Sequence, residues 1–270
     1  IPWILKLIDR KVKWFVMVDN LVPPPHQRPG FWFRNFIPYV AFLLGELMLK
    51  KADGIFVLTN FLHKHYKEGD YKVIQTGDHY GIETQIFKGP VSEKAPCYDA
   101  LYVGRLHEAK GIFDLLEVVR EVVKFKKDFI LGVMGDGEES IKKRLNEKIN
   151  SCGLRKNIIF NGYVVGKLKG DILRKAGFFL FLSHDEAGSH AVLEAVVNNK
   201  AVLAYNLPAY HYVYKKEIKN GQMVLFKKGD FKGIANFILS LNLNENEYFH
   251  KLEDYTWDKI CQKELESFQK

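Results

Sequence analysis

The most restrictive feature of this sequence is the alternation, from Tyr98 onward, of short apolar runs with amphipathic segments. Runs such as "DALYVG", "FILGVMG" and "FFLFLS" are rich in β-branched and aromatic residues, which is typical of buried strands. The segments between them, for example "GIFDLLEVVREVVKF", repeat apolar residues at helical spacing. A parallel sheet covered by helices on both faces accounts for this order, so we predict a doubly wound α/β domain. Ligands of such domains bind beyond the carboxyl ends of the strands.

A second α/β unit is indicated upstream, where "WFVMVDN", "GIFVLTN" and "YKVIQT" read as strands. Three strands are too few for a complete unit, so we expect an incomplete N-terminal domain and a missing part of the natural N-terminus. Glycine, proline and charges in 77–96 are typical of a linker, and "YTWDKICQKELESFQK" reads as an amphipathic helix. We therefore predict a partial N-terminal domain with its linker at 1–88, a C-terminal domain at 89–250 and a closing helix at 251–270.

The charge balance narrows the class of partner. The chain has 40 Lys and Arg against 32 Asp and Glu, a net charge of +8, which favours a phosphorylated small molecule, an acidic membrane surface or nucleic acid. The basic residues are spread along the chain without a nucleic-acid-binding motif, so nucleic acid is the weakest of the three. Three distant cysteines without CxxC spacing speak against a disulfide framework or a zinc site, and they fit a cytoplasmic protein.

The most apolar stretch of the chain is 31–51, which Arg34, Pro38 and Glu46 interrupt. It falls short of the roughly 18 apolar residues that a membrane span needs. We favour a buried helix here over a helix that lies on a membrane surface with aromatic anchors.

Two cations follow the first strand of the C-terminal domain, in "VGRLHEAKG". Arg105 and Lys110 lie before a helix that starts near Gly111, so both are at the positive end of a helix dipole. A phosphate or diphosphate relieves this arrangement, because Arg binds it as a planar fork, Lys as a point charge and the free helix amides as donors. Ordinary surface pairs with Glu108 and Asp114 are equally compatible with this loop alone.

The stretch "HDEAGSHAVLEA" places two carboxylates, Glu186 and Glu194, around a Gly-Ser turn. A helix from Ser189 leaves the amides of Ser189, His190 and Ala191 free, which makes a second anion site on the same rim. If both glutamates were helical, eight steps of about 1.5 Å would separate them by roughly 12 Å, beyond a glycosidase acid/base pair. They can instead accept hydrogen bonds from sugar hydroxyls. Taken singly, dipole complementation by Glu186 and a Lys partner for Glu194 remain alternatives.

Single positions exclude other phosphate-binding motifs. "VMGDGEES" has Ser140 where the dinucleotide fingerprint needs its third glycine, and "GYVVGKLK" has Leu168 where a Walker loop needs Ser or Thr. No DxD pair is present to hold a metal against a diphosphate, and no His cluster has zinc spacing. A diphosphate site without a metal is the interpretation that remains.

Four stretches follow one another in this order: "YVGRLHEAKG", "GVMGDGEE", "IIFNGYV" and "FLSHDEAGSHAVLEAVVNNKAVLAYN". Together they resemble the C-terminal donor-binding domain of retaining GT-B glycosyltransferases of family 4, the glycosyl transferases group 1. "YGIETQIFK" is similar to that family's connector, and "TWDKICQKEL" to its closing helix, which crosses back to the N-terminal domain. The resemblance covers about residues 14–270. It implies a GT-B fold of two Rossmann-like, doubly wound α/β domains.

The family's Arg-x4-Lys and Glu-x7-Glu elements match as Arg105/Lys110 and Glu186/Glu194. By this resemblance the two cations hold the diphosphate of a nucleotide sugar and stabilise it as it leaves, Glu186 contacts the transferred sugar and Glu194 takes the ribose hydroxyls. Arg105, Lys110 and Glu186 are thus the implied catalytic residues. Further donor contacts are implied at Gly104, Gly135, Tyr163, Val164, Ser189, His190 and Ala191. The family has Gly-Phe-Gly or Gly-Phe-Pro after the first Glu, whereas this chain has Ala187, Gly188 and Ser189.

The resemblance implies a metal-independent hexosyltransferase that moves a sugar with retention from a UDP-, GDP- or ADP-sugar to an acceptor hydroxyl, without a cofactor. The implied acceptor is a polysaccharide, a lipid-linked glycan or a glycoprotein glycan, in the cytoplasm or peripherally at the inner face of the cell membrane. Asp19 or His26 would act on the acceptor side, although a loop Asp and a surface His are equally compatible with the sequence. Two alternatives stay open: a nucleotide-sugar epimerase of the same fold, and a subunit that binds the donor without turning it over.

Overall fold

The computed structural model describes residues 9, 11–18, 36–57, 59–75, 80–241 and 250–268. The chain divides into two compact units, Ile1–Tyr80 with Asp258–Lys270, and Gly81–Trp257. Asp19 and His26, the candidates for the acceptor side, lie outside the described residues.

The first unit contains a parallel sheet in the order β1-β2-β3. Strand β1 (Phe15–Val18) pairs with β2 (Gly54–Val57), which pairs with β3 (Val73–Gln75). Strand β2 is buried at every position, as a central parallel strand requires. Helix α3 (Asn60–Glu68) follows it and is capped by the Thr59 hydroxyl. Most of helix α11 (Trp257–Phe268) is grouped with this unit.

Helix α2 (Phe36–Leu49), also in the first unit, differs from the buried helix expected within 31–51. Its residues Leu43, Leu44 and Leu47 are 43, 50 and 61% exposed. The expectation of burial was therefore wrong for these positions, because a helix that is apolar nearly all round does not show in its sequence which side is covered. No helix in the described part of the chain is long and apolar enough to cross a bilayer.

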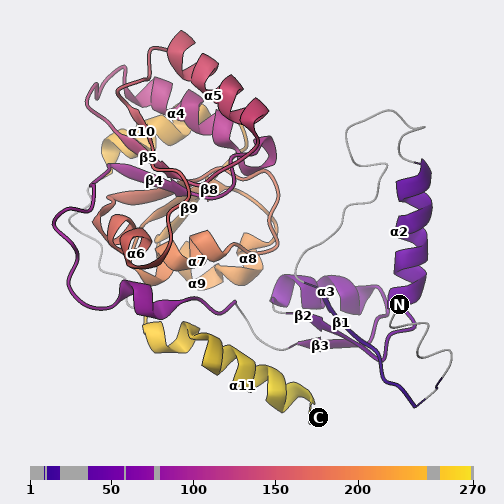
Figure 1. Ribbon diagram of the computed structural model, residues 1–270. Helices are drawn as coiled ribbons and strands as arrows, with labels where there is room; N and C mark the ends of the chain where they lie inside the picture. The colour runs from indigo at the N-terminus through magenta and orange to yellow at the C-terminus, as the bar shows by residue number, and fades with distance from the viewer. Residues whose placement is uncertain are drawn as a thin grey trace. The chain divides into compact units, whose positions relative to one another are not determined.

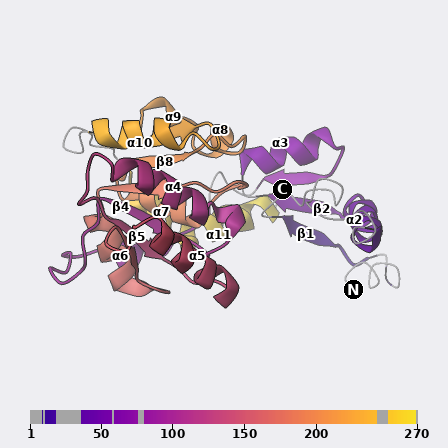
Figure 2. The ribbon, with the colours of Figure 1, turned by 90° about the horizontal axis from the view of Figure 1, so that it is seen from above.

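The second unit contains a sheet in which every strand pairing is parallel, so the predicted α/β fold is confirmed. Figures 1 and 2 show helices α4, α5 and α10 on one face of this sheet and α6 and α7 on the other. The strand order is β6-β5-β4-β7-β8-β9. In chain order the strands are β4 (Ala100–Val103), β5 (Leu131–Met134), β6 (Ile158–Phe160), β7 (Phe178–Phe181), β8 (Val202–Tyr205) and β9 (Met223–Phe226). The helices are α4 (Ile112–Val122), α5 (Glu139–Ser151), α6 (Gly166–Lys175), α7 (His190–Val197), α8 (Tyr210–Val213), α9 (Lys215–Lys219) and α10 (Phe231–Ser240).

The strand order reverses between β4 and β7. Strand β4 pairs with β5 on one side and with β7 on the other, so the chain moves outward to β6 and then returns past β4. The loops that leave β4 and β7 therefore diverge over opposite faces of the sheet. In open parallel sheets this divergence leaves a crevice at the carboxyl edge, which is where ligands bind. The motifs around Arg105 and Glu186 both lie in these two loops.

The segment expected to be a linker contributes buried side chains to the second unit. Ile82, Ile86 and Phe87 are 3 to 6% exposed, and the short 3-10 helix η3 (Thr84–Phe87) packs against α6. The contact is so close that a Cβ atom at Gly170 would lie 2.1 Å from the carbonyl oxygen of Ile86. A glycine at this position of α6 thus lets η3 approach the rim of the sheet.

Candidate functional site

A cavity of about 550 Å³ opens at the carboxyl edge of the second unit's sheet. Its wall is formed by the loops after β4, β5 and β6, together with residues of η3, α6 and α7. Six of the predicted donor-site residues lie on this wall: Gly104, Arg105, Gly135, Tyr163, Val164 and Glu194. The other lining residues are Glu83, Ile86, Val103, Met134, Asp136, Val165, Gly166 and Lys169.

Gly135 holds the loops of this wall together. Its N–H donates to the carbonyl oxygen of Gly162 at 2.8 Å, and the amide of Gly104 donates to Met134 at 3.0 Å. Gly135 has a φ of +151°, and a Cβ atom there would lie 1.8 Å from the carbonyl oxygen of Gly104. Only glycine fits this conformation and this contact, so the loops after β4, β5 and β6 can meet.

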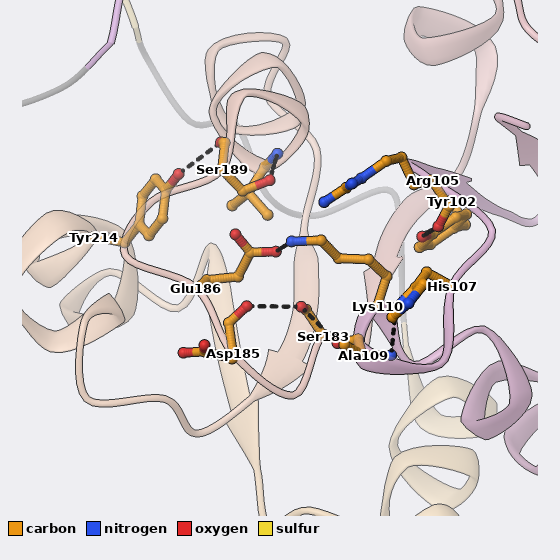
Figure 3. A network of polar contacts seen from close by, with 11 residues as sticks. Tyr102, Arg105, His107, Ala109, Lys110, Ser183, Asp185, Glu186, Ser189 and Tyr214 are labelled. Carbon is orange, nitrogen blue, oxygen red and sulfur yellow. Dashed lines mark hydrogen bonds and ion pairs between the residues drawn. The ribbon is translucent and has the colours of Figure 1, made fainter. Parts of the chain in front are cut away.

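Lys110 and Glu186 form an ion pair between the loops that follow β4 and β7 (Figure 3). The Lys110 Nζ atom lies 2.5 Å from Glu186 Oε1, and the two side chains are 23 and 6% exposed. Two hydrogen bonds between the loops hold the pair in place, because the backbone amide of His184 and the side-chain hydroxyl of Ser183 both donate to the carbonyl oxygen of Ala109. A cation and a buried carboxylate are therefore positioned together where the strand order reverses.

The separation of roughly 12 Å was conditional on both glutamates being helical, and the structure does not meet that condition. Glu186 lies in the loop before α7 rather than in a helix, so the distance of roughly 12 Å computed from helical rise does not apply. Helix α7 begins at His190, one residue after the predicted start, with Ser189 as its N-cap. The Ser189 hydroxyl accepts from the Val192 amide, and its carbonyl oxygen accepts from the Tyr214 hydroxyl at 3.0 Å.

The Arg105 side chain is exposed and extends toward the Lys110–Glu186 pair (Figure 3). Its backbone carbonyl accepts from the buried Tyr102 hydroxyl at 2.8 Å. The guanidinium group has no hydrogen-bond or ion-pair partner among the described residues. Burial raises the pKa of Tyr102, the charge of Glu186 raises it further, and the charge of Arg105 lowers it. Both charges therefore act on the same buried hydroxyl.

The alternative partners for these cations are engaged elsewhere. Glu108 forms an ion pair with Arg144. Asp114 accepts from the Tyr205 hydroxyl at 2.7 Å and lies 2.8 Å from His184 Nε2. The alternative of ordinary surface pairs for Arg105 and Lys110 is thus wrong in its choice of partners.

Glu194 projects from α7 into the cavity wall and uses only one of its two carboxylate oxygens. Its Oε1 atom accepts from Lys169 Nζ at 2.6 Å, and its side chain is 8% exposed. Its Oε2 atom is buried and has no partner among the described residues. A buried acceptor without a donor costs free energy, and a bound hydroxyl group would supply that donor. The alternative of a Lys partner for Glu194 is confirmed for Oε1, with Lys169 as that partner.

The sequence analysis missed Lys169, Glu83, Ile86 and Asp136, which all line the cavity. One signal could have found Lys169: it lies three and four residues before Ile172 and Leu173, so it belongs to the buried face of α6. The described residues contain no group of three or more His, Cys, Asp or Glu side chains that could hold a metal ion.

Solved structures similar to this chain share the GT-B fold. TarM of S. aureus superposes with a TM-score of 0.67 at 18% identity, over 96% of this chain and 51% of TarM. Sucrose-phosphate synthase of Thermosynechococcus elongatus gives a TM-score of 0.74 at 15% identity, over 99% of this chain and 70% of the synthase. HepE of Anabaena, solved with UDP and glucose, gives a TM-score of 0.66 at 14% identity, over 98% of this chain and 69% of HepE. The GT-B fold is thus shared despite low sequence identity.

Residues 83–256 match the family Glycosyl transferases group 1, and the chain belongs to this family. A relative in Methanocaldococcus jannaschii, an uncharacterized glycosyltransferase, is 26% identical over 210 residues, 73% of this chain and 49% of the relative. The poly(ribitol-phosphate) alpha-N-acetylglucosaminyltransferase of Staphylococcus aureus is 25% identical over 175 residues, 62% of this chain and 34% of the relative. The matches thus span at most about half the length of these curated relatives.

Proposed function

We propose that this chain binds a nucleoside diphosphate sugar in the cavity at the carboxyl edge of the second unit and transfers the sugar to an acceptor hydroxyl. One observation carries the proposal: the same cavity wall holds an arginine without a counter-ion and a buried carboxylate oxygen without a donor, Arg105 and Glu194 Oε2. A diphosphate needs the first and a sugar hydroxyl needs the second. A nucleoside diphosphate carries both groups in one molecule.

The proposed roles follow from charge and position. Arg105 and Lys110 bind the diphosphate and stabilise the negative charge that forms on it when its bond to the sugar C1 breaks. The acceptor oxygen bonds to C1 on the face from which the diphosphate departs, which gives retention, and the proton of the acceptor hydroxyl passes to the departing diphosphate oxygen. Lys110 is free for this role once its contact with Glu186 is exchanged for phosphate. Glu186 then accepts from hydroxyls of the transferred sugar, and no metal is required.

The donor and acceptor classes are proposed from the relatives. TarM and HepE have been solved with UDP, so UDP-sugars rank first among UDP-, GDP- and ADP-sugars. The S. aureus relative is named for a glycan polymer, and we propose a hydroxyl of a polysaccharide or lipid-linked glycan as the acceptor. The exposed leucines of α2 offer an apolar contact for the inner face of the cell membrane. The named relatives are transferases, which favours neither an epimerase nor a non-catalytic subunit.

Calorimetric titration with UDP, GDP and ADP in EDTA tests the proposal. We expect micromolar binding of one diphosphate, and an affinity at least about 10-fold lower for Arg105→Ala, because a charge-assisted hydrogen bond contributes about 1.5–3 kcal/mol. Arg120→Ala is the matched control, since Arg120 lies exposed on α4 and pairs with Glu117. Binding that is absent in the unaltered chain, or equal in Arg105→Ala, would contradict the proposed site.

A further inference from the structure

Lys169 of α6 is a second charged residue in the cavity wall, and the family motifs do not include it. Its Nζ atom donates to Glu194 Oε1 at 2.6 Å, and its side chain is 20% exposed. The neighbouring lysine, Lys167, instead pairs with Asp171 on the same helix and is 46% exposed. Two lysines of one helix are thus placed differently, one in the cavity and one at the surface.

The ion pair is incomplete on both sides. Glu194 Oε2 is buried without a partner in the described structure, and Lys169 makes no other hydrogen bond there. An ammonium group has three N–H donors, so two remain after the contact with Glu194. Both residues line the cavity, and the pair retains one unsatisfied acceptor and two unused donors. A half-buried ion pair costs desolvation, which further contacts of this kind offset.

These groups fit hydroxyls better than phosphate. A hydroxyl group donates one hydrogen bond and accepts others, so it can donate to Glu194 Oε2 and accept from Lys169 Nζ. A phosphate only accepts, and it would be repelled by the unpaired carboxylate oxygen. Lys169 is neutralised by Glu194, whereas Arg105 has no counter-ion in the described structure. By charge, Arg105 thus suits a phosphate, and the Lys169–Glu194 pair suits hydroxyls.

We propose that Lys169 and Glu194 act as one unit that recognises the adjacent 2′- and 3′-hydroxyls of the donor's ribose, which makes Lys169 a specificity-determining residue for ribonucleotides. The inference rests on the proposed function, because it requires a nucleoside diphosphate in this cavity. Lys169 holds one oxygen of Glu194, which aims the other at the ligand, and it donates to the ribose oxygens itself. A change at Lys169 therefore alters discrimination between ribose and deoxyribose as well as affinity.

The test is calorimetric titration with UDP, 2′-deoxy-UDP and 3′-deoxy-UDP, or with the same three forms of whichever diphosphate binds. For the unaltered chain we expect each deoxy ligand to bind about 10-fold more weakly than UDP, a change of about 1.4 kcal/mol. For Lys169→Met we expect weaker UDP binding and a deoxy penalty below about 3-fold, because the hydroxyls have lost a partner. Lys169→Arg should restore most of the discrimination, and Lys167→Met should match the unaltered chain.

If the role of Lys169 were purely structural, Lys169→Met would weaken the binding of UDP and of deoxy-UDP by the same factor. That result would overturn the inference. If Lys169→Met shows no cooperative thermal unfolding transition, Lys169→Arg and Lys169→Gln test the inference in its place. The Gln variant must lose the deoxy penalty and the Arg variant must keep it, and any other pair of results rejects the inference. Diphosphate binding that depends on Arg105 but not on Lys169 rejects this inference alone. No binding of UDP, GDP or ADP to the unaltered chain rejects the proposed function too.

Discussion

Lys110 Nζ lies 2.5 Å from Glu186 Oε1, although the two residues are 76 positions apart in the chain. They meet because β4 and β7 are neighbours in the sheet and the loops after both strands cross the same edge. Without a ligand each residue is the counter-ion of the other. A diphosphate that enters the crevice must therefore compete with Glu186 for Lys110.

This competition predicts opposite effects of two variants on diphosphate affinity. Lys110→Met should weaken binding about 10- to 100-fold, because a charged donor to phosphate is lost. Glu186→Gln should leave the affinity equal or a few-fold higher, because the competing charge is gone, while sugar transfer falls. Calorimetry with the nucleoside diphosphate and turnover of its sugar donor measure the two effects. Lys124→Met, at an exposed lysine that follows α4, is the control. Equal losses of affinity in both variants would refute competition.

Gly135→Ala should abolish donor binding through the backbone. Its added Cβ atom would lie 1.8 Å from the carbonyl oxygen of Gly104, so the loops after β4 and β5 must separate. Gly153→Ala is the matched control, since Gly153 has a φ of +69° with no atom within 4 Å of an added Cβ. The free energy of unfolding of the control should fall by only about 1 kcal/mol, the cost of the backbone conformation, and its diphosphate affinity should not change. Full affinity in Gly135→Ala, measured by calorimetry, would be incompatible with this wall of the cavity.

Asp114 of α4 contacts His184 in the loop after β7 and Tyr205 of β8, and its removal should destabilise the fold. Its carboxylate accepts from the Tyr205 hydroxyl at 2.7 Å, and Tyr205 is buried. Asp114→Ala leaves that O–H without its acceptor, so the free energy of unfolding should fall by about 1–3 kcal/mol in urea denaturation. Adding Tyr205→Phe should recover part of this loss, because the unsatisfied group is then absent. Strictly additive losses in the double variant would show that the contact does not stabilise the protein.

Because of His250, we expect the protein to lose stability in mild acid. Its Nε2 donates to Gln222 Oε1 at 2.8 Å, and burial, with a smaller effect of the Lys216 charge, lowers its pKa below the ordinary 6.5. The unfolded chain therefore takes up the proton first, so this stability is present above pH 6.5 and is lost as the pH falls toward the lowered pKa. The slope is at most about 1.4 kcal/mol per pH unit. Between pH 7.5 and pH 5.5, the urea midpoint of unfolding should fall more for the unaltered chain than for His250→Gln. Equal falls in the two proteins would exclude the effect.

Much of the fold could be predicted because the strands are short, buried and bounded by turn residues. The alternation after Tyr98 is local information, and Ser189 marked the start of α7 to within one residue. The strand order β6-β5-β4-β7 is not local, and neither is the meeting of Lys169 with Glu194, which depends on how α6 and α7 lie on the sheet. The composition of 77–96 indicated a linker because the packing of Ile86 against Gly170, far along the chain, is likewise not visible in the local sequence.

The most direct test of the central claim is a crystal structure of this chain with UDP, or with whichever diphosphate binds, grown in EDTA. We expect the diphosphate oxygens within hydrogen-bond distance of Arg105 and Lys110, and a ribose hydroxyl on Glu194 Oε2. A diphosphate bound away from Arg105, for example at Lys142 in the adjoining cavity of about 330 Å³ after β5, would contradict the proposed donor site.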